Sequence, residues 1–430
     1  MDAATKSETS GLHSILLDKF IALVGNEHAR AATAADAIAG MQPKLVVAPG
    51  TETELAEVLR LSNEAGLAVI PRGGGTKLGW GNPPARADLI LSTARLNEII
   101  EHAWADLTVT VGAGCTIQKL EEMLAQHGQR LALDPLWPEK ATIGGVLSTN
   151  DSGALRLRFG ALRDLIIGAT IALPDGTLAS SGGKVVKNVA GYDLPKLVTG
   201  ALGTLGIITR AVFRLHPLPR GTRSFSIVTA NAEEAQRIAL EIQDSRLAHT
   251  SLQSHFSDDA PPISDILFEG TEAGLNAQEA QFRKLCASAG VSEASTSGLK
   301  AREMLWAFAE PASAAMAKIG ILPVNLARTI QFAEHIAKEK QLRWKALTYA
   351  TGIGWLRLEG EASSLRGALQ ALRGELERQG GSVVVLHRPA KMAEFDAWGN
   401  AGDAIPLMKA VKRQLDTKST LNPGRFVGGI

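Results

Sequence analysis

Residues 71–81, PRGGGTKLGWG, follow a short apolar run and contain three consecutive glycines. Two more glycine-dense stretches come later, PEKATIGGVLSTNDSG at 138–153 and KNVAGYDLPKLVTGALGTLGIIT at 187–209. Each stretch stands where a buried strand or a turn is expected to end. A pyrophosphate needs several backbone N–H groups that converge without Cβ atoms in the way, and glycine-rich turns supply them. The three stretches together predict a cradle for a long, dianionic cofactor.

Two common phosphate-binding motifs are absent from the sequence. No Gly-Lys-Ser/Thr follows a glycine at the spacing of a nucleotide-hydrolase loop. The nearest match to the dinucleotide fingerprint GxGxxG begins at Gly112 and Gly114 but has Ile117 at the third glycine position. A nicotinamide-binding domain is therefore disfavoured.

The residues around the glycine stretches alternate between strand and helix patterns. Residues 44–71 predict a strand–helix–strand unit, with a Thr/Glu start signal and a Gly stop for the helix. A second unit follows over 107–128, and 162–180 predict a hairpin with a Pro-Asp-Gly turn. We therefore expect a bilobed cofactor domain made of two α/β subdomains.

A Pro/Gly/Arg-rich connector at 217–222 marks a change of composition. Strand–helix alternation occurs twice beyond it, which predicts one antiparallel sheet with helices on one side. The expected class is α+β, with an α/β cap domain. The expected boundaries are a helical arm over 1–40, the cofactor domain over 41–220, the cap over 221–404 and a returning segment over 405–430.

The composition is that of a globular protein of two or three domains. Apolar residues make up 45% of the 430 residues, and 45 Lys and Arg balance 44 Asp and Glu, which disfavours nucleic acid as a partner. The two cysteines are too few for a self-contained iron–sulfur cluster. Because no signal-peptide pattern and no apolar run of about 18 residues occurs, we expect a cytoplasmic protein.

The ordered motifs resemble those of the FAD-binding oxidoreductases of the vanillyl-alcohol oxidase superfamily. They are Pro-Arg-Gly-Gly-Gly-Thr-Lys, Ala-Thr-Ile-Gly-Gly, Lys-Asn-Val-Ala-Gly-Tyr-Asp with Gly-Thr-Leu-Gly-Ile-Ile-Thr, and the terminal Leu-Asn-Pro-Gly-Arg. The chain looks most like the glycolate oxidase and D-lactate dehydrogenase branch. The resemblance covers residues 41–220 and 405–430, whereas 221–400 agree only in the order of elements.

This resemblance implies a flavoprotein and assigns residues to FAD. The first stretch would hold the pyrophosphate, the second would follow the ribityl chain and isoalloxazine, the third would contact the adenosine side, and the terminal asparagine would reach the flavin ring. The residues are Arg72, Gly73, Gly74, Gly75, Thr76, Leu78, Gly79, Pro135, Thr142, Ile143, Gly144, Gly145, Thr149, Ser152, Gly206, Ile207, Ile208 and Asn422. Residues expected to pack beneath the cofactor are Lys187, Asn188, Tyr192 and Asp193. Relatives with covalent flavin place a His in the glycine loop, and its absence here implies non-covalent FAD.

The chain departs from this family in its cap domain. Catalytic members of the D-2-hydroxyacid branch carry Gly-Asp-Gly-Asn-Leu-His, preceded by another His, and these histidines bind a metal that holds the hydroxyacid. Here the string is Gly352-Ile353-Gly354-Trp355-Leu356-Arg357, and Tyr349–Ala350 stand where the other His would be. The remaining histidines His255, His335 and His387 are isolated in the sequence and typical of surface or packing residues. We expect no metal site, and the catalytic residues stay unassigned.

The chain retains the cofactor-binding stretches and lacks the metal ligands. This pattern resembles that of the family of accessory FAD-binding subunits of glycolate oxidase. That resemblance implies partners, namely a catalytic flavoprotein subunit and an iron–sulfur subunit. We therefore expect an FAD-binding subunit of a 2-hydroxyacid dehydrogenase complex that carries electrons or supports assembly, with peripheral inner-membrane contact only through its partners.

Two alternatives stay open. The first is a self-sufficient FAD oxidoreductase that acts on a 2-hydroxyacid or another small alcohol, in a cap pocket lined by Trp355, Arg357, Arg388 and Lys391. The second is a flavin-binding scaffold without redox chemistry.

Overall fold

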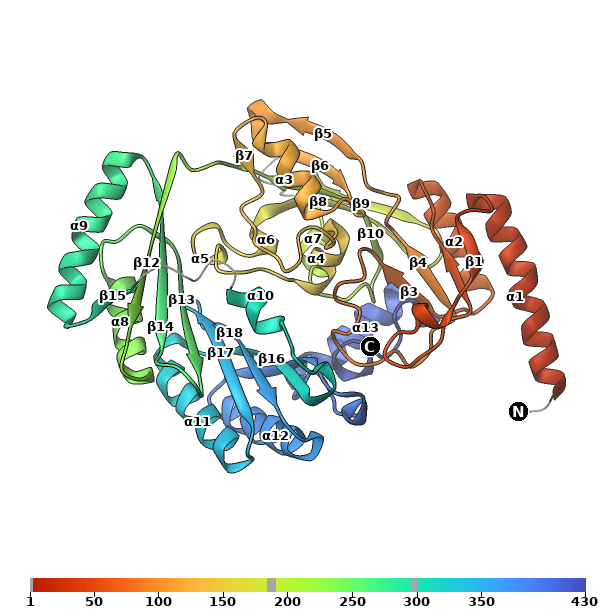
Figure 1. Ribbon diagram of the computed structural model, residues 1–430. Coiled ribbons are helices and arrows are strands. Elements are labelled where there is room, and N and C mark those ends of the chain that lie inside the picture. The colour runs from red at the N-terminus through yellow and green to blue at the C-terminus, as the bar shows by residue number, and fades with distance from the viewer. Residues whose placement is uncertain (1–2, 184–190, 295–300) are drawn as a thin grey trace. The chain divides into compact units, whose positions relative to one another are not determined.

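The computed structural model describes residues 3–183, 191–294 and 301–430 (Figure 1). The chain divides into two compact units, which are described separately. Unit 1 comprises Met1–Asp151, Ala161–His216 and Ala401–Ile430, and unit 2 comprises Ser152–Gly160 and Pro217–Asn400. The sequence placed 41–220 in one domain and gave no sign that 152–160 pack with unit 2.

The first sheet of unit 1 has the order β1-β2-β4-β3. Its strands are β1 (Ala29–Ala31), β2 (Leu45–Val47), β3 (Val69–Arg72) and β4 (Leu89–Ser92). Strands β2 and β3 both run parallel to β4, and β1 is antiparallel to β2. Helix α2 (Glu52–Glu64) connects β2 to β3. It begins at Thr51, whose side chain accepts a hydrogen bond from the Glu54 amide, and buries Leu55, Val58 and Leu59. This βαβ unit delivers the first glycine stretch at the end of β3.

The second sheet of unit 1 is antiparallel, with the order β5-β6-β10-β8-β9. Its strands are β5 (Ile99–Ala103), β6 (Thr108–Gly112), β8 (Ile166–Ala172), β9 (Leu178–Gly182) and β10 (Ile207–Arg214). The hairpin expected over 162–180 is present as β8 and β9. The short strands β7 (Gln129–Arg130) and β11 (His216–Pro217) pair separately. Remaining helices are α3 (Ile117–Ala125), α4 (Ile143–Thr149), α6 (Leu162–Leu165), α7 (Leu194–Val198) and α13 (Ile405–Leu415), with 3-10 turns η1 (Ala34–Asp36), η2 (Trp104–Asp106) and η8 (Val427–Gly429).

The N-terminal arm differs from expectation beyond residue 24. Helix α1 (Ala3–Val24) packs Leu16, Phe20 and Val24 into the core of the first sheet. The chain then forms strand β1, which pairs with β2 from Ala29 to Ala31. The helical arm expected over 1–40 is helical in α1, but Ala29–Ala31 form a strand, because strand pairing at a sheet edge is a tertiary contact that an Ala-rich sequence does not reveal.

Unit 2 contains one antiparallel sheet with the order β15-β12-β14-β13-β17-β18-β16-β19. The chain makes this sheet from two βαββαβ halves in which the strands have the same relative order. The first half is β12 (Gly221–Val228), α8 (Ala232–Asp244), β13 (His249–Ser257), β14 (Ile263–Gly270), α9 (Glu272–Ala289) and β15 (Ser292–Ala294). The second is β16 (Ala314–Gly320), α11 (Leu326–Glu339), β17 (Arg343–Tyr349), β18 (Ile353–Glu359), α12 (Ala362–Arg378) and β19 (Ser382–His387). Strands β13 and β17 join the halves.

The helices α5 (Arg156–Phe159) and α10 (Ala301–Trp306) complete unit 2. Its 3-10 turns are η4 (Pro311–Ser313), η5 (Pro323–Asn325) and η6 (Ala390–Met392), and η7 (Gly402–Ala404) lies just beyond it in unit 1.

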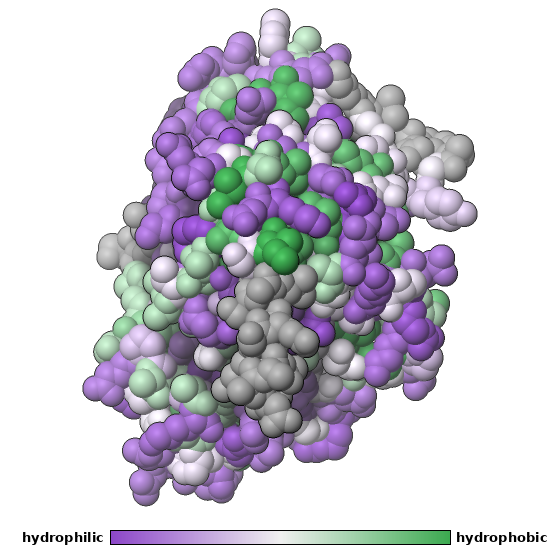
Figure 2. All heavy atoms as spheres, turned by 90° about the vertical axis from the view of Figure 1, so that its right-hand side faces the viewer, coloured by the Kyte–Doolittle hydropathy of each residue, from purple (hydrophilic) through white to green (hydrophobic). Residues whose placement is uncertain are grey.

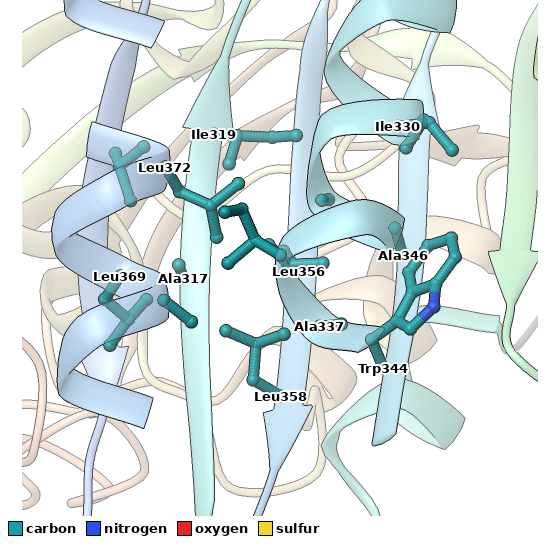
Figure 3. Close-up of a cluster of buried hydrophobic side chains, with 14 of the residues drawn as sticks. Ala317, Ile319, Ile330, Ala337, Trp344, Ala346, Leu356, Leu358, Leu369 and Leu372 are labelled. Carbon is teal, nitrogen blue, oxygen red and sulfur yellow. The ribbon is translucent and has the colours of Figure 1, made fainter. Parts of the chain in front are cut away.

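The core of the second half lies between the sheet and helices α11 and α12 (Figure 3). Leu356 and Leu358 of β18 point toward these helices, where they meet Leu369 and Leu372 of α12. Because strand side chains alternate between faces, Trp355 and Arg357 lie on the opposite face of the sheet. Mixed α/β character is therefore present in both units.

The face drawn in Figure 2 carries hydrophilic residues with hydrophobic residues gathered in smaller areas between them. Isolated exposed apolar side chains are ordinary on a protein surface. Over the described residues, every helix is too short or too polar to cross a lipid bilayer.

Candidate functional site

A cavity in unit 1, with about 700 Å³ of empty space when open solvent is included, collects residues from all three glycine stretches and from the C-terminal segment. It opens beyond the carboxyl end of β3, the usual ligand position in an open α/β sheet. The lining residues are Pro71, Arg72, Gly73, Gly74, Gly75, Thr76, Lys77, Leu78, Thr93, Thr142, Gly144, Gly145, Ser148, Thr149, Leu202, Gly203, Ile207, Ile208, Asn422 and Arg425.

The first glycine stretch lies directly against the second. A Cβ atom at Gly74 would be 1.7 Å from the carbonyl oxygen of Lys140, and one at Gly73 would be 2.1 Å from Oγ1 of Thr142. No side chain fits at these distances, so both positions require glycine. The backbone of residues 73 and 74 therefore packs closely against the second stretch, and both glycines line the cavity.

Helix α4 carries the second stretch along the cavity wall. Its N-cap Thr142 accepts a hydrogen bond from the Gly145 amide through Oγ1. Gly144 lies so close to Ala113 that a Cβ atom there would be 2.9 Å from the alanine methyl group. This contact brings the α4 backbone against the end of β6, and Ser148 and Thr149 of α4 line the cavity. The Thr149 hydroxyl donates to the Gly145 carbonyl of the same helix (2.8 Å).

The C-terminal segment closes the cavity from another part of unit 1. It pairs with β3, since Val69 N–H donates to the Thr420 carbonyl (2.7 Å) and Asn422 N–H donates to the Val69 carbonyl (3.0 Å). The Asn422 Nδ2 donates to the carbonyl of Leu202 (2.5 Å), whereas its Oδ1 is buried without a hydrogen-bond partner. An orphaned acceptor in a cavity wall is suited to a ligand N–H.

The described lining residues include three basic side chains and no carboxylate. They are Arg72, Lys77 and Arg425. Arg72 Nη1 lies 3.0 Å from Oδ1 of the buried Asp36, and Arg425 donates to the carbonyls of Leu78 and Trp80. Such an excess of positive charge suits a dianionic ligand.

Asp36 anchors Arg72 from the N-terminal segment. The hydrogen bond from Arg30 holds the pKa of Asp36 well below its usual range against the effect of burial, and Thr33 and Arg72 add further hydrogen bonds. The charged carboxylate therefore fixes the arginine at the cavity edge.

Thirteen of the eighteen predicted FAD residues line this cavity, and five do not. Those in the lining are Arg72, Gly73, Gly74, Gly75, Thr76, Leu78, Thr142, Gly144, Gly145, Thr149, Ile207, Ile208 and Asn422. Those outside it are Gly79, Pro135, Ile143, Gly206 and Ser152. Ile143 is a core residue, and Ser152 belongs to unit 2, where its carbonyl accepts a hydrogen bond from Arg302 Nη1 (2.8 Å).

The residues expected beneath the cofactor are only partly described. Lys187 and Asn188 lie outside the described residues. Tyr192 is 90% exposed, so the prediction that it packs beneath the cofactor is not met, and Asp193 caps helix α7.

Sequence reasoning missed several lining residues, notably Lys77, Ser148, Gly203 and Arg425. Lys77 and Arg425 stand inside motifs that the sequence analysis quoted. Their basic charge beside the glycines was the available signal.

Of the residues expected to line a cap pocket, namely Trp355, Arg357, Arg388 and Lys391, the first two are buried. Trp355 is 1% exposed, and Arg357 binds Glu359 and donates to the carbonyls of Leu305 and Ala307. The cavity of unit 2 that we describe, about 340 Å³, has other walls. They include Leu252, Leu326 and Tyr349.

Two of the histidines that are isolated in the sequence have partners in the fold. His255 Nε2 lies 2.7 Å from Oδ2 of Asp265. The ring of His387 stacks on Phe308 at a centroid distance of 4.7 Å. Within the described residues, no three His, Cys, Asp or Glu side chains form a metal-binding group.

Comparisons with known proteins agree with a flavin site in unit 1. Residues 43–182 match the family described as FAD binding domain. Sequence similarity extends to a D-lactate dehydrogenase of Archaeoglobus fulgidus (35% identity, 46% of this chain and 44% of the relative) and to the glycolate oxidase subunit GlcD of Bacillus subtilis (32%, 49% and 45%). A D-2-hydroxyglutarate dehydrogenase of Xanthomonas citri pv. viticola is 27% identical over 89% of each chain.

The first two relatives are matched over less than half of their length. A solved structure of p-cresol methylhydroxylase with substrate bound superposes with a TM-score of 0.78 at 15% identity, covering 96% of each chain. This likeness shows a common fold. Residues 43–182 thus match an FAD-binding domain family, and two of the relatives are named dehydrogenases.

Proposed function

We propose that this chain, which carries an FAD-binding domain, holds one FAD non-covalently in the unit 1 cavity and serves as the FAD-binding subunit of a 2-hydroxyacid dehydrogenase complex. A catalytic flavoprotein subunit and an iron–sulfur subunit would be its partners. The relatives named for D-lactate, glycolate and D-2-hydroxyglutarate support the substrate class.

The cavity supports FAD as the ligand through its donors and its charge. Backbone amides of residues 72–76 would hold the pyrophosphate, and the Asn422 Oδ1 would accept a hydrogen bond from the flavin. When bound, FAD would supply a two-electron acceptor for the electrons that a catalytic partner removes from the 2-hydroxyacid as it becomes a 2-oxoacid. The chain's own residues bind and orient the flavin for electron transfer.

The subunit assignment rests on the burial and the hydrogen bonds of Arg357. This residue stands where the resembling enzymes place a metal-binding imidazole, and it is 7% exposed. Glu359 and two backbone carbonyls already occupy its guanidinium. A guanidinium cannot serve as a neutral metal ligand, and this one has its charge balanced within its own strand. Substrate oxidation is therefore assigned to a partner.

One observation favours a second candidate, a self-sufficient dehydrogenase. The similarity to the Xanthomonas D-2-hydroxyglutarate dehydrogenase spans 89% of both chains, which is more than unit 1 alone provides. A single-chain enzyme on the same scaffold would need no partner.

Anaerobic spectroscopy of the purified chain distinguishes these candidates. Acid or heat denaturation should release yellow FAD into the supernatant. Glycolate, D-lactate and D-2-hydroxyglutarate should leave the flavin of the isolated chain oxidised, although dithionite reduces it. Substrate should bleach the flavin once the proteins that co-purify from the native host are present.

The other outcomes have definite meanings. Bleaching of the isolated chain by one of the three acids would contradict the subunit assignment and support the single-chain enzyme. FAD that stays oxidised in the complete complex would indicate a scaffold. A folded chain that is colourless and takes up no FAD would refute the flavoprotein assignment altogether.

A further inference from the structure

Lys412 and Asp416 form a buried ion pair in the C-terminal segment of unit 1. Lys412 lies on α13, and Asp416 is the residue at which that helix ends. The Lys412 Nζ lies 2.6 Å from Oδ2 of Asp416, and the two side chains are 7% and 0% exposed. The ammonium uses its remaining donors on two backbone carbonyls, those of Thr204 (2.7 Å) and Leu421 (3.0 Å). Its three N–H groups are thus satisfied within the protein, so any contribution to a ligand site must be indirect.

The carboxylate of Asp416 binds the same stretch of backbone. Its Oδ1 accepts the N–H of Thr420 (2.8 Å), and its Oδ2 accepts the N–H of Leu421 (2.8 Å). The ion pair therefore holds both the N–H and the carbonyl of Leu421, the residue directly before Asn422. Through the Thr204 carbonyl it ties this backbone to the third glycine stretch.

Two cavity-lining residues beside these contacts have a strained backbone. Leu202 has a φ of 51° and Asn422 a φ of 43°, in the left-handed region that residues with side chains seldom adopt. The two meet directly, since Asn422 Nδ2 donates to the Leu202 carbonyl (2.5 Å). Strain of this kind persists only where surrounding contacts impose it, and it concentrates at ligand sites. Lys412 supplies such contacts on both sides of the junction, two residues after Leu202 and one residue before Asn422.

The strained arrangement fixes the side-chain amide of Asn422. Its Nδ2 is held by the Leu202 carbonyl, whereas its Oδ1 is buried and has no hydrogen-bond partner within the part of the chain that the structure describes. A buried acceptor without a partner costs free energy until a ligand donor completes it.

Stability alone is a weak reason to bury this ion pair. Removing two charges from water costs free energy that their attraction often does not recover, and apolar residues of similar volume commonly serve as well. A ligand provides a stronger reason, because contacts that order an acceptor before binding reduce the cost of ordering it at binding.

We propose that Lys412 and Asp416 are positioning residues for the cofactor, whose ion pair holds Leu202 and Asn422 together so that Asn422 Oδ1 stays fixed as an acceptor for an N–H group of FAD. The inference rests on the proposed function, which places FAD in this cavity. It gives a role at the flavin site to two side chains that do not touch the ligand themselves.

The test compares two kinds of variant by titrating flavin-stripped protein with FAD. Asn422→Gly removes the amide but suits the positive φ, so the backbone can keep its path. The pair variant K412M/D416N removes both charges, so that neither is left alone in the interior. Each should raise the Kd for FAD about tenfold, as expected for the loss of one buried hydrogen bond.

The decisive variant combines these changes. K412M/D416N/N422G should bind FAD within about twofold of N422G, because residues that act through one another give non-additive effects. The midpoint potential of bound FAD, which hydrogen bonds to the flavin tune, should shift in the same direction in N422G and in the pair variant.

Thermal unfolding of each apoprotein shows whether the variants fold. Should the pair variant not fold, Lys412→Arg enters the same cycle. It keeps the charge, but a planar guanidinium cannot direct its N–H groups to these three acceptors as the ammonium does. It should weaken FAD binding in the wild-type background and not in the N422G background.

Lys409→Met is the matched control. Lys409 lies on the same helix, one turn before Lys412, and is exposed. Its removal should leave the Kd for FAD unchanged within about twofold and the potential unchanged, as for an uninvolved surface charge.

Three results would overturn the inference while leaving the flavoprotein assignment intact. The first is a folded pair variant with the FAD affinity of wild type. The second is a triple variant whose Kd is raised about a hundredfold, the product of two independent tenfold effects, which would mean that the ion pair does not act through Asn422. The third is a pair variant that binds FAD weakly at the wild-type potential although N422G shifts it, which would make the role one of general packing. By contrast, failure of the wild-type apoprotein to bind FAD at all would refute the proposed function itself.

Discussion

At the scale of the residue, Gly74 is the position with the least room for change. A Cβ atom there would lie 1.7 Å from the Lys140 carbonyl oxygen, far inside van der Waals contact. Gly74→Ala must therefore separate the two glycine stretches, and we expect FAD content below about one tenth of wild type with a loss of about 1 to 3 kcal/mol in the free energy of unfolding. The ratio of flavin to protein absorbance and a denaturant titration measure these effects.

Gly79→Ala is the control, because a Cβ atom at Gly79 meets nothing within 4 Å. It should retain FAD and change the free energy of unfolding by less than about 0.5 kcal/mol, as for an ordinary surface substitution. Full FAD content in Gly74→Ala would show that the two stretches need not touch.

The glycines of the first stretch show how far sequence reasoning extends at this scale. The run of glycines predicted the cavity, and Gly73 and Gly74 lie in its lining. Sequence spacing did not separate them from Gly79, because only the fold decides which Cβ would meet backbone. Lys77 was missed for a related reason, since its partner Asp151 lies beside it only in the folded chain.

At the scale of the element, the turn η1 links the N-terminal segment to the cavity. Its last residue, Asp36, binds Arg30 and Arg72 together, and the resulting hydrogen bonds lower its pKa in the folded state. A carboxyl whose pKa is lower when folded stabilises the protein above its unfolded pKa of about 4, and this contribution is lost as pH falls below that value.

Asp36→Asn should therefore lower the free energy of unfolding by about 2 kcal/mol at neutral pH, the usual worth of hydrogen bonds to a charged group. The difference from wild type should shrink as pH falls below about 4, because the Asp36 carboxyl of the unfolded chain takes up a proton there while the folded one stays ionised. FAD should also bind more weakly, because Arg72 loses its anchor at the cavity edge. Denaturant unfolding across this pH range and an FAD titration provide the measurements.

Glu57→Gln serves as the comparison, because Glu57 pairs with Arg60 on the exposed surface of α2. Its effect should stay within about 1 kcal/mol at every pH, as for surface ion pairs in general. An Asp36→Asn difference that stays constant down to acid pH would contradict a charge-based anchor.

Elements were predictable where local signals and tertiary contacts agree. The unit β2–α2–β3 has an N-cap at Thr51 and a one-sided apolar helix, and both are visible in the sequence. Strand β1 was not predictable, since three residues with little β-propensity form it only by pairing with β2.

At the scale of the whole molecule, the candidate flavin cavity and the core of the unit 2 sheet belong to different units. Every lining residue of the candidate flavin cavity belongs to unit 1, including those from the returning C-terminal segment. The sequence indicated such a return through its terminal Asn-Pro-Gly-Arg. It contained no signal that Ser152–Gly160 belongs to unit 2, because that assignment depends on contacts between α5 and β13 in the folded chain.

A core substitution in unit 2 tests this separation. Leu372 on α12 is 1% exposed and packs between the helix and the sheet beside Leu369 and Leu356 (Figure 3). Leu372→Ala should lower the stability of unit 2 by about 3 kcal/mol, the usual cost of a cavity left by a buried leucine, whereas FAD content should remain that of wild type. Hydrogen exchange followed by peptide should quicken in α12 and β16 to β19 and stay unchanged over residues 69–81. Gln370→Ala, an exposed change on the same helix, should alter neither region. Loss of FAD in step with the weakened unit 2 core would mean that the two units unfold as one cooperative structure, since the substitution itself touches no residue of the cavity.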